Sequence, residues 1–178
     1  MSTGRKIVLY IATSVDGFIA KENGDINWLH EVESQGEGDS GYEEFYNTID
    51  TVLIGKKTYD QIFSLVDEFP YVGKKCYVFS RSKSGKDDYV EYVNGDLFSF
   101  TKKIKAEEGK DIWLVGGGEL FNSFLKENLV DEIIITVIPI ILGKGIPLFN
   151  NDNSGYNLTL KKTTAYGEFV QLHYIINR

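Results

Sequence analysis

Cysteine and histidine are scarce in this sequence, which holds one cysteine and two histidines in 178 residues. These two residue types supply most protein ligands of zinc, so there is little material for a zinc site. The one cysteine, Cys76, lies in the apolar stretch KKCYVF, which predicts a buried strand residue rather than a nucleophile. His173 falls within the last predicted strand, where a surface histidine is expected instead of a catalytic one.

A positive net charge and long apolar runs are also missing. The formal net charge of −7 argues against a general binder of nucleic acids or of anionic membranes. No apolar run is long enough to span a membrane. The first residues, MSTGRKIVLYIA, lack the apolar core and cleavage site of a signal peptide, so we expect a cytoplasmic protein.

The sequence does contain enough apolar material for a sizeable core. Hydrophobic residues make up 42% of the chain and aromatic residues 13%, and the length favours one domain over residues 1–178. Strands are predicted at residues 6–13, 51–54, 76–79, 89–93, 112–115 and 132–138, and helices at residues 42–49, 58–66 and 97–106. A long hairpin that turns at Gly167 ends the pattern. This order predicts an α/β fold with a mostly parallel central sheet and an antiparallel C-terminal hairpin, flanked by helices.

Three consecutive glycines stand out in the stretch DIWLVGGGELFNSFLK. Gly116, Gly117 and Gly118 separate a predicted strand from a helix that carries Leu120 and Phe121 on its apolar side. Unpaired amides and the helix dipole favour an anionic phosphate at such a junction. The glycines are equally explained by a tight turn that lets the helix pack closely on the sheet. The spacing differs from the GxGxxG dinucleotide fingerprint, so both interpretations stay open.

Several strand ends are expected to meet this turn. In parallel sheets, ligands bind beyond the carboxyl ends of the strands. The predicted ends are Ala12-Thr13, Gly55-Lys56, Ser80-Arg81 and the glycine triplet. If these strands are parallel neighbours, the four turns share one edge of the sheet.

Taken in order, these segments resemble the dihydrofolate reductase fold family. VLIGKKTYDQI is similar to that family's strand and following helix start, and LVGGGELFNSFL is similar to its glycine turn. IATSVDGFIA and VDEIIITVIPIILGKGIPLF resemble the C-terminal reductase domain of the riboflavin-biosynthesis deaminase/reductase and its small stand-alone relatives. The His-x-Glu and Pro-Cys-x-x-Cys motifs of the zinc deaminase half are absent from the sequence.

The resemblance implies a three-layer dihydrofolate reductase-like fold and an oxidoreductase that uses NADPH. Its implied substrate is a small heterocycle or ribosylamine, foremost 5-amino-6-(5-phosphoribosylamino)uracil. A pterin reductase and a non-catalytic nucleotide-binding protein are the alternatives. The resemblance also implies a homodimer, which the apolar run 138–142 and the long hairpin favour as well.

The resemblance carries the cofactor over to particular positions. Ala12 and Ile19 would lie near the nicotinamide, and the glycine turn would admit the pyrophosphate. The remaining implied cofactor residues are Gly55, Lys56, Thr58, Ser80, Arg81, Glu119 and Leu120.

Three positions depart from the family pattern. Glu119 stands where an arginine commonly follows the triplet, and Lys56 replaces an arginine that could form a bidentate fork. Gly116 stands where riboflavin-pathway reductases often have an acidic residue. The substrate therefore remains open.

Three residues are implied as substrate contacts. Asp16, in the SVDG turn, would be the catalytic proton relay or a substrate contact, and a loop-shaping Asx turn is its alternative. Counting back from Gly55 puts Asp39 where dihydrofolate reductases hold a pterin-binding carboxylate. Trp28 would form a wall of the substrate pocket or a part of the core.

Overall fold

The structure, a computed structural model, describes residues 4–151 and 154–178. Strands and helices alternate along most of the chain. In order, they are β1 (Ile7–Ser14), β2 (Phe18–Ala20), α1 (Asn27–Glu31), the 3-10 helix η1 (Glu33–Gln35), α2 (Tyr42–Tyr46), β3 (Ile49–Gly55), α3 (Lys56–Leu65), β4 (Lys75–Phe79), β5 (Gly85–Lys86), β6 (Glu91–Val93), α4 (Leu97–Ala106), β7 (Asp111–Gly116), α5 (Gly118–Lys126), β8 (Glu132–Ile138), β9 (Ile146–Pro147), β10 (Leu158–Tyr166) and β11 (Phe169–Ile176).

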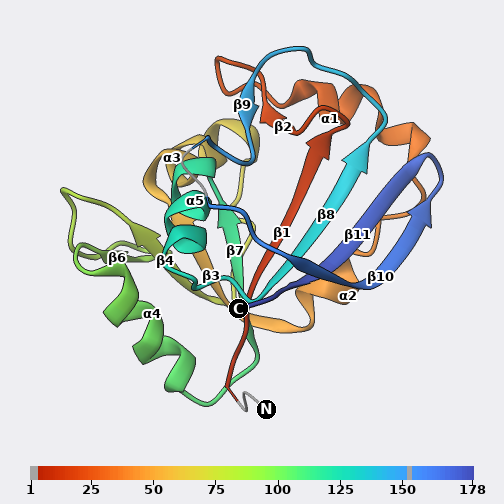
Figure 1. Ribbon diagram of the computed structural model, residues 1–178. Coiled ribbons are helices and arrows are strands. Elements are labelled where there is room, and N and C mark those ends of the chain that lie inside the picture. Colours follow the sequence, from red (N-terminus) through yellow and green to blue (C-terminus); the bar gives the residue numbers. More distant parts are fainter. Residues whose placement is uncertain (1–3, 152–153) are drawn as a thin grey trace.

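A nine-stranded sheet in the order β10-β11-β8-β1-β7-β3-β4-β6-β5 runs through the molecule (Figure 1). From β8 to β6, every neighbouring pair is parallel. The C-terminal strands β10 and β11 add an antiparallel hairpin to one side. The predicted fold class is therefore confirmed, and the short antiparallel pair of β2 with β9 is an addition to it.

Helices cover both faces of the central strands, because successive strand residues point to opposite faces. On β1, Leu9 packs in a core with Ile104 of α4 and Phe121 of α5, which lie on the near side of the sheet in Figure 1. The adjacent residue Val8 packs in a second core with Phe45 of α2 and α3 residues. The result is a helix–sheet–helix sandwich.

The elements with the clearest sequence patterns have the predicted bounds. Helix α4 begins after Asp96, whose carboxylate accepts a hydrogen bond of 2.7 Å from the Ser99 amide and so caps the first turn. The prediction of a helix over residues 42–49 is wrong at its end. The helix stops at Tyr46, and Ile49, which is fully buried, begins strand β3 instead.

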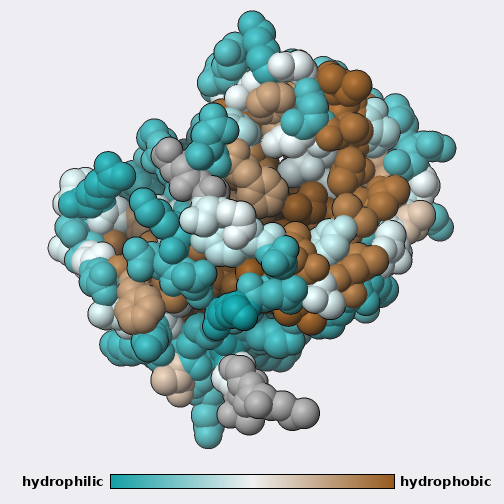
Figure 2. Space-filling model, in the orientation of Figure 1, coloured by the Kyte–Doolittle hydropathy of each residue, from teal (hydrophilic) through white to brown (hydrophobic). Residues whose placement is uncertain are grey.

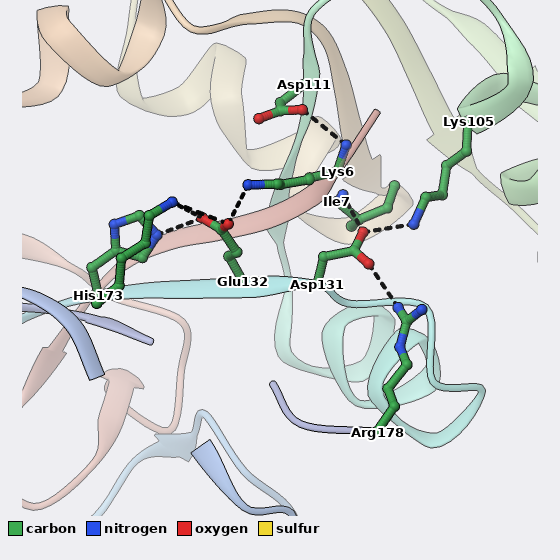
Figure 3. A network of polar contacts seen from close by, with 9 residues as sticks. Lys6, Ile7, Lys105, Asp111, Asp131, Glu132, His173 and Arg178 are labelled. Atoms are coloured by element: carbon green, nitrogen blue, oxygen red, sulfur yellow. Dashed lines mark hydrogen bonds and ion pairs between the residues drawn. The ribbon is translucent and has the colours of Figure 1, made fainter. Parts of the chain in front are cut away.

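Ion pairs gather at the edge where the parallel strands begin. Arg5 is buried and pairs with Asp50, the second residue of β3. At the start of β8, the buried carboxylate of Glu132 lies between Lys6 and His173 (Figure 3). This amino-terminal edge is thus held together by side chains paired with one another.

Two kinds of feature are absent from the described residues. Residues 4–151 and 154–178 contain no helix that is long and apolar enough to cross a membrane. The same residues contain no group of three or more histidine, cysteine, aspartate or glutamate side chains arranged to hold a metal ion.

Candidate active site

The carboxyl ends of the parallel strands meet at the opposite edge, as the sequence predicts. Gly55 at the end of β3 pairs with Phe79, which directly precedes Ser80 and Arg81. Ile54 pairs with Gly116 at the end of β7. In Figure 1 the arrows of β1 and β8 point to this edge at the top, where β2, β9 and α1 lie.

Two helices begin side by side at this edge, each directly after a glycine. Gly55 precedes α3 and Gly117 precedes α5, and neither helix has a side chain that caps its first turn. A Cβ atom placed on Gly55 would lie 3.2 Å from the Gly117 amide nitrogen. Unpaired amides and the positive ends of two helix dipoles therefore meet at one spot.

The glycine turn has a backbone that other residues rarely adopt. Gly116 has a φ of 122°, a conformation that favours glycine, and a cis peptide bond joins it to Gly117. A Cβ on Gly117 would lie 3.0 Å from the Thr58 hydroxyl oxygen. A Cβ on Gly118 would lie 3.6 Å from Ile19. The fold thus brings Thr58 and Ile19, from distant parts of the sequence, to the triplet, and Leu120 packs beside Gly55.

The cations expected at the cofactor site differ in how they are paired. The ammonium group of Lys56 contacts both carboxylate oxygens of Asp60, one turn along α3. Lys57 lies 3.6 Å from Glu119, so this exposed ion pair links the beginnings of α3 and α5. The exposed Arg81 guanidinium has no ion-pair partner among the described residues. A new anion therefore meets least competition at Arg81.

Ser80 holds the loop that follows β4. Its hydroxyl oxygen accepts hydrogen bonds from the amides of Lys83, at 3.0 Å, and Ser82, at 3.3 Å. Its own amide donates to the Val93 carbonyl at 3.0 Å, which joins the ends of β4 and β6. The residue therefore fixes the backbone that presents Arg81.

Asp16 uses its carboxylate to connect two loops. Its Oδ1 atom accepts hydrogen bonds from the Ser14 hydroxyl, at 2.6 Å, and from the Leu142 amide, at 3.1 Å. Its Oδ2 atom accepts from the Gly143 amide at 2.7 Å. The hydrogen bond from the Ser14 hydroxyl has the largest effect on the pKa of Asp16 and lowers it; desolvation opposes this, and the bonds from the Leu142 and Gly143 amides add to the lowering. These contacts favour the loop-shaping interpretation over a proton donor.

The other two predicted substrate residues are not presented to the glycine turn. Trp28 is fully buried in a small core with Ile138 and Phe169, which favours the core interpretation over a pocket wall. Ala12 packs against the same core. Asp39 accepts hydrogen bonds at the start of α2 from the Gly41 and Glu43 amides, and the Glu43 bond foremost lowers the pKa of Asp39. It lines a shallow hollow beside α2 that includes no residue of the triplet.

Sequence reasoning missed the contribution of residues 139–149. This segment leaves β8, and the Pro147 carbonyl oxygen would lie 3.4 Å from a Cβ on Gly118. Asn122 of α5 donates from its side-chain amide to the Leu148 carbonyl at 2.9 Å. The stretch GKGIP was the sequence signal for this segment. Its two glycines, Gly143 and Gly145, both adopt positive φ values, which other residues rarely do.

Besides the hollow that Asp39 lines, the described residues form a recess and a groove. Figure 2 shows a recess near the edge formed by the carboxyl strand ends, with hydrophobic side chains along its right-hand side. A separate groove of about 210 Å³ lies between α2 and the hairpin, where Tyr10, Glu132 and His173 line it. The groove contains none of the glycine-turn residues, so we assign the candidate site to the recess.

The comparison with protein families agrees with this geometry. The family model described as the RibD C-terminal domain matches residues 78–172, more than half of the chain. The chain belongs to the RibD C-terminal domain family. Within the RibD-type chain, the matched region begins in β4 and ends in β11, so it includes the whole glycine turn.

Individual proteins cover nearly the whole RibD-type chain. YwjB, an uncharacterised protein of Bacillus subtilis (strain 168), is 52% identical over 172 residues, which are 96% of this chain and 98% of YwjB. The crystal structure of a protein provisionally assigned to riboflavin biosynthesis, from Shewanella sp. PV-4, has a TM-score of 0.86 and 32% identity, covering 97% and 99% of the two chains. Dihydrofolate reductase from Enterococcus faecalis, complexed with NADP(H), has a TM-score of 0.69 and 15% identity, covering 97% of each chain. This last likeness shows the fold alone.

Proposed function

We propose that this protein is an NADPH-dependent reductase that transfers hydride to a small heterocycle or ribosylamine, foremost 5-amino-6-(5-phosphoribosylamino)uracil. One observation carries the proposal: two helices without side-chain caps begin next to each other, one after Gly55 and one at the glycine turn, in a chain of the RibD C-terminal domain family. The Enterococcus reductase, which shares the fold, is complexed with NADP(H). The proposal is therefore supported by the geometry at the carboxyl ends of the parallel strands and by the family to which the chain belongs.

The residues present fit this cofactor. The space that a Cβ on Gly117 would fill, beside Thr58, is open to a phosphate, and amides at both helix starts can donate to it. We propose that Arg81, with Lys56 and Ser80, holds the adenosine-side phosphates. Ile19, which packs near Gly118, would lie against the nicotinamide.

When bound, NADPH supplies the hydride. The protein binds and orients the cofactor and excludes water from its reactive end. Thr58 and the glycine amides would hold the pyrophosphate, and the 139–149 segment covers the start of α5. Because Asp16 already accepts three hydrogen bonds, we assign the proton to another donor, such as water or a group of the substrate.

The pattern of buried charge favours the ribosylamine over a pterin. A pterin needs a buried carboxylate to bind it, but Asp39 is exposed and caps α2. Among the described residues, Glu132 is the one buried carboxylate, and it lies at the amino-terminal edge of the sheet. Neither Asp39 nor Glu132 therefore offers the buried carboxylate at this edge that a pterin requires.

We further propose a single-domain, cytoplasmic homodimer. One sheet extends from residue 7 to residue 176, which supports a single domain. On the hairpin, Leu158, Leu160 and Val170 are 42%, 53% and 40% exposed, and Figure 2 shows hydrophobic residues gathered over β8 and β11. An apolar face of this kind favours association with a second copy.

Cofactor titration and turnover test the proposal. The parent protein should bind NADPH and oxidise it with a pyrimidine ribosylamine in a substrate panel. Gly117→Val should weaken NADPH binding by roughly tenfold, ~1.4 kcal/mol, because the branched side chain fills the space beside Thr58. Gly155→Val is the matched control, since a Cβ on Gly155 meets open space. Binding without turnover would favour a non-catalytic protein, and unchanged affinity in folded Gly117→Val would refute the site.

A further inference from the structure

The 139–149 segment is attached to the turn after β1 along its whole length. The Val15 amide donates to the Ile140 carbonyl at 2.8 Å, and the Leu148 amide donates to the Gly17 carbonyl at 3.0 Å. Between these two bonds, β9 pairs with β2. The segment therefore moves only if the turn after β1 moves with it.

Asp16 lies at the middle of this attachment. It accepts from the Leu142 and Gly143 amides, which are 126 and 127 positions away in the sequence. The buried Ser14 hydroxyl fixes the carboxylate, because it donates to Asp16 and accepts from the Phe18 amide at 2.9 Å. Three donors thus point at two carboxylate oxygens, and a neutral amide could not satisfy all of them.

The other end of the segment reaches the glycine turn. Asn122 donates both to the Gly118 carbonyl, at 2.7 Å, and to the Leu148 carbonyl, at 2.9 Å. Gly145, at φ 157°, has no space for a Cβ because the Ala20 carbonyl oxygen lies against it. The segment is therefore held by side chains at two places, by Asp16 at Leu142 and Gly143 and by Asn122 at Leu148.

We propose that Asp16 is a positioning residue: its carboxylate holds the 139–149 segment in the place that closes the reactive end of the cofactor site. The inference rests on the proposed function, since it assigns the nicotinamide to the space between Ile19 and the glycine turn. It replaces the proton-relay role, because a proton donor must first be protonated, and a protonated carboxyl group accepts the hydroxyl and the two amide donors less well than a carboxylate does.

The test compares Asp16→Asn with Asp25→Asn. Asp25 is a suitable control because it is also a loop aspartate, but its side chain accepts from Asn27, two positions away. Hydrogen exchange should be faster for the amides of residues 140–148 in Asp16→Asn and unchanged in Asp25→Asn. Turnover of Asp16→Asn should fall roughly tenfold to a hundredfold, because the displaced segment would no longer hold the reacting groups in the geometry for hydride transfer. The KM for NADPH should change much less, since the pyrophosphate and adenosine contacts lie elsewhere.

The pH profile separates positioning from proton transfer. For a positioning residue, the profile of kcat/KM keeps its shape in Asp16→Asn and only its height falls. Ser14→Ala, which leaves the carboxylate in place and removes its hydroxyl donor, should lower turnover in the same direction with the same profile shape.

Two results would overturn the inference. Unchanged exchange of residues 140–148 in Asp16→Asn would show that the carboxylate does not anchor the segment. Loss of one limb of the pH profile in that variant, with full activity in Ser14→Ala, would make Asp16 a proton donor instead. A parent protein that does not oxidise NADPH would refute the proposed function and the catalytic part of this inference, while the exchange result still decides the anchoring.

Discussion

Replacing Glu132 by glutamine should destabilise the protein at neutral pH and much less in acid. Burial at the start of β8 opposes ionisation of this carboxyl group, but hydrogen bonds from His173, Lys6 and Lys161 outweigh burial and lower its pKa to about 2 (Figure 3). Its side chain is 6% exposed, so water screens these contacts little. The ionised form is therefore strongly favoured in the folded protein.

The shift sets both the size and the pH range of the effect. From an ordinary value of 4.5 to about 2, the ionisation of Glu132 contributes about 3 kcal/mol to the free energy of unfolding at pH 7. The folded-state pKa is lowered, so this stability is present above pH 4.5 and is lost as the pH falls towards 2. By about pH 3, less than half of it should remain.

Urea denaturation at a fixed protein concentration measures the effect. Glu132→Gln should lower the free energy of unfolding by about 3 kcal/mol at pH 7, with an unchanged m-value, and the gap to the parent should narrow towards pH 3. Glu91→Gln is the control, because Glu91 forms an exposed ion pair with Lys86 at 3.4 Å. This substitution should lower the free energy of unfolding by less than about 1 kcal/mol. A difference in the free energy of unfolding between the parent and Glu132→Gln below about 0.5 kcal/mol at pH 7, or a difference that stays constant with pH, would refute the reasoning.

Two further predictions concern the cofactor and the assembly. NADPH should bind more tightly than NADH, and Arg81→Ala should weaken NADPH roughly tenfold with little effect on NADH, since Asp60 already shares the charge of Lys56. The preference should shrink with added salt in titrations at two ionic strengths, and equal losses for both cofactors would contradict it. Light scattering at micromolar concentration should give a dimeric mass for the parent and a monomeric mass for folded Leu160→Glu, which places a charge on the exposed hairpin face. A monomeric parent would disprove the dimer.

Local patterns were sufficient to predict much of the fold. Leu97–Ala106 and Glu132–Ile138 have the predicted bounds because a capping aspartate and an unbroken run of β-branched residues act through near neighbours. Ile49 was assigned wrongly because its apolar side chain continues the helical spacing of α2, and only pairing with Asp111 and burial in the sheet decide its structure.

The shared position of several candidate site residues was predictable, and their roles stay predictions. The shared edge of Gly55, Arg81 and the glycine triplet follows from strands of known type and direction. The partners of Asp16 do not, because they lie on a segment more than a hundred positions away. The pairing of Lys56 with Asp60 was visible as an i,i+4 spacing, and that spacing alone was a usable signal.

The position of β1 in the sheet also determines the order in which this chain can fold. β1 precedes every other strand of the described sheet in the sequence, but it lies in the middle of that sheet between β7 and β8. Its Ile7 pairs with Ile112, so the closing loop spans more than a hundred residues. Until β7 emerges from the ribosome, an apolar strand remains without either of its neighbours, exposed to association with other chains. Formation of the β1–β7 pair therefore limits how early in synthesis the central sheet, and with it the glycine turn, can assemble.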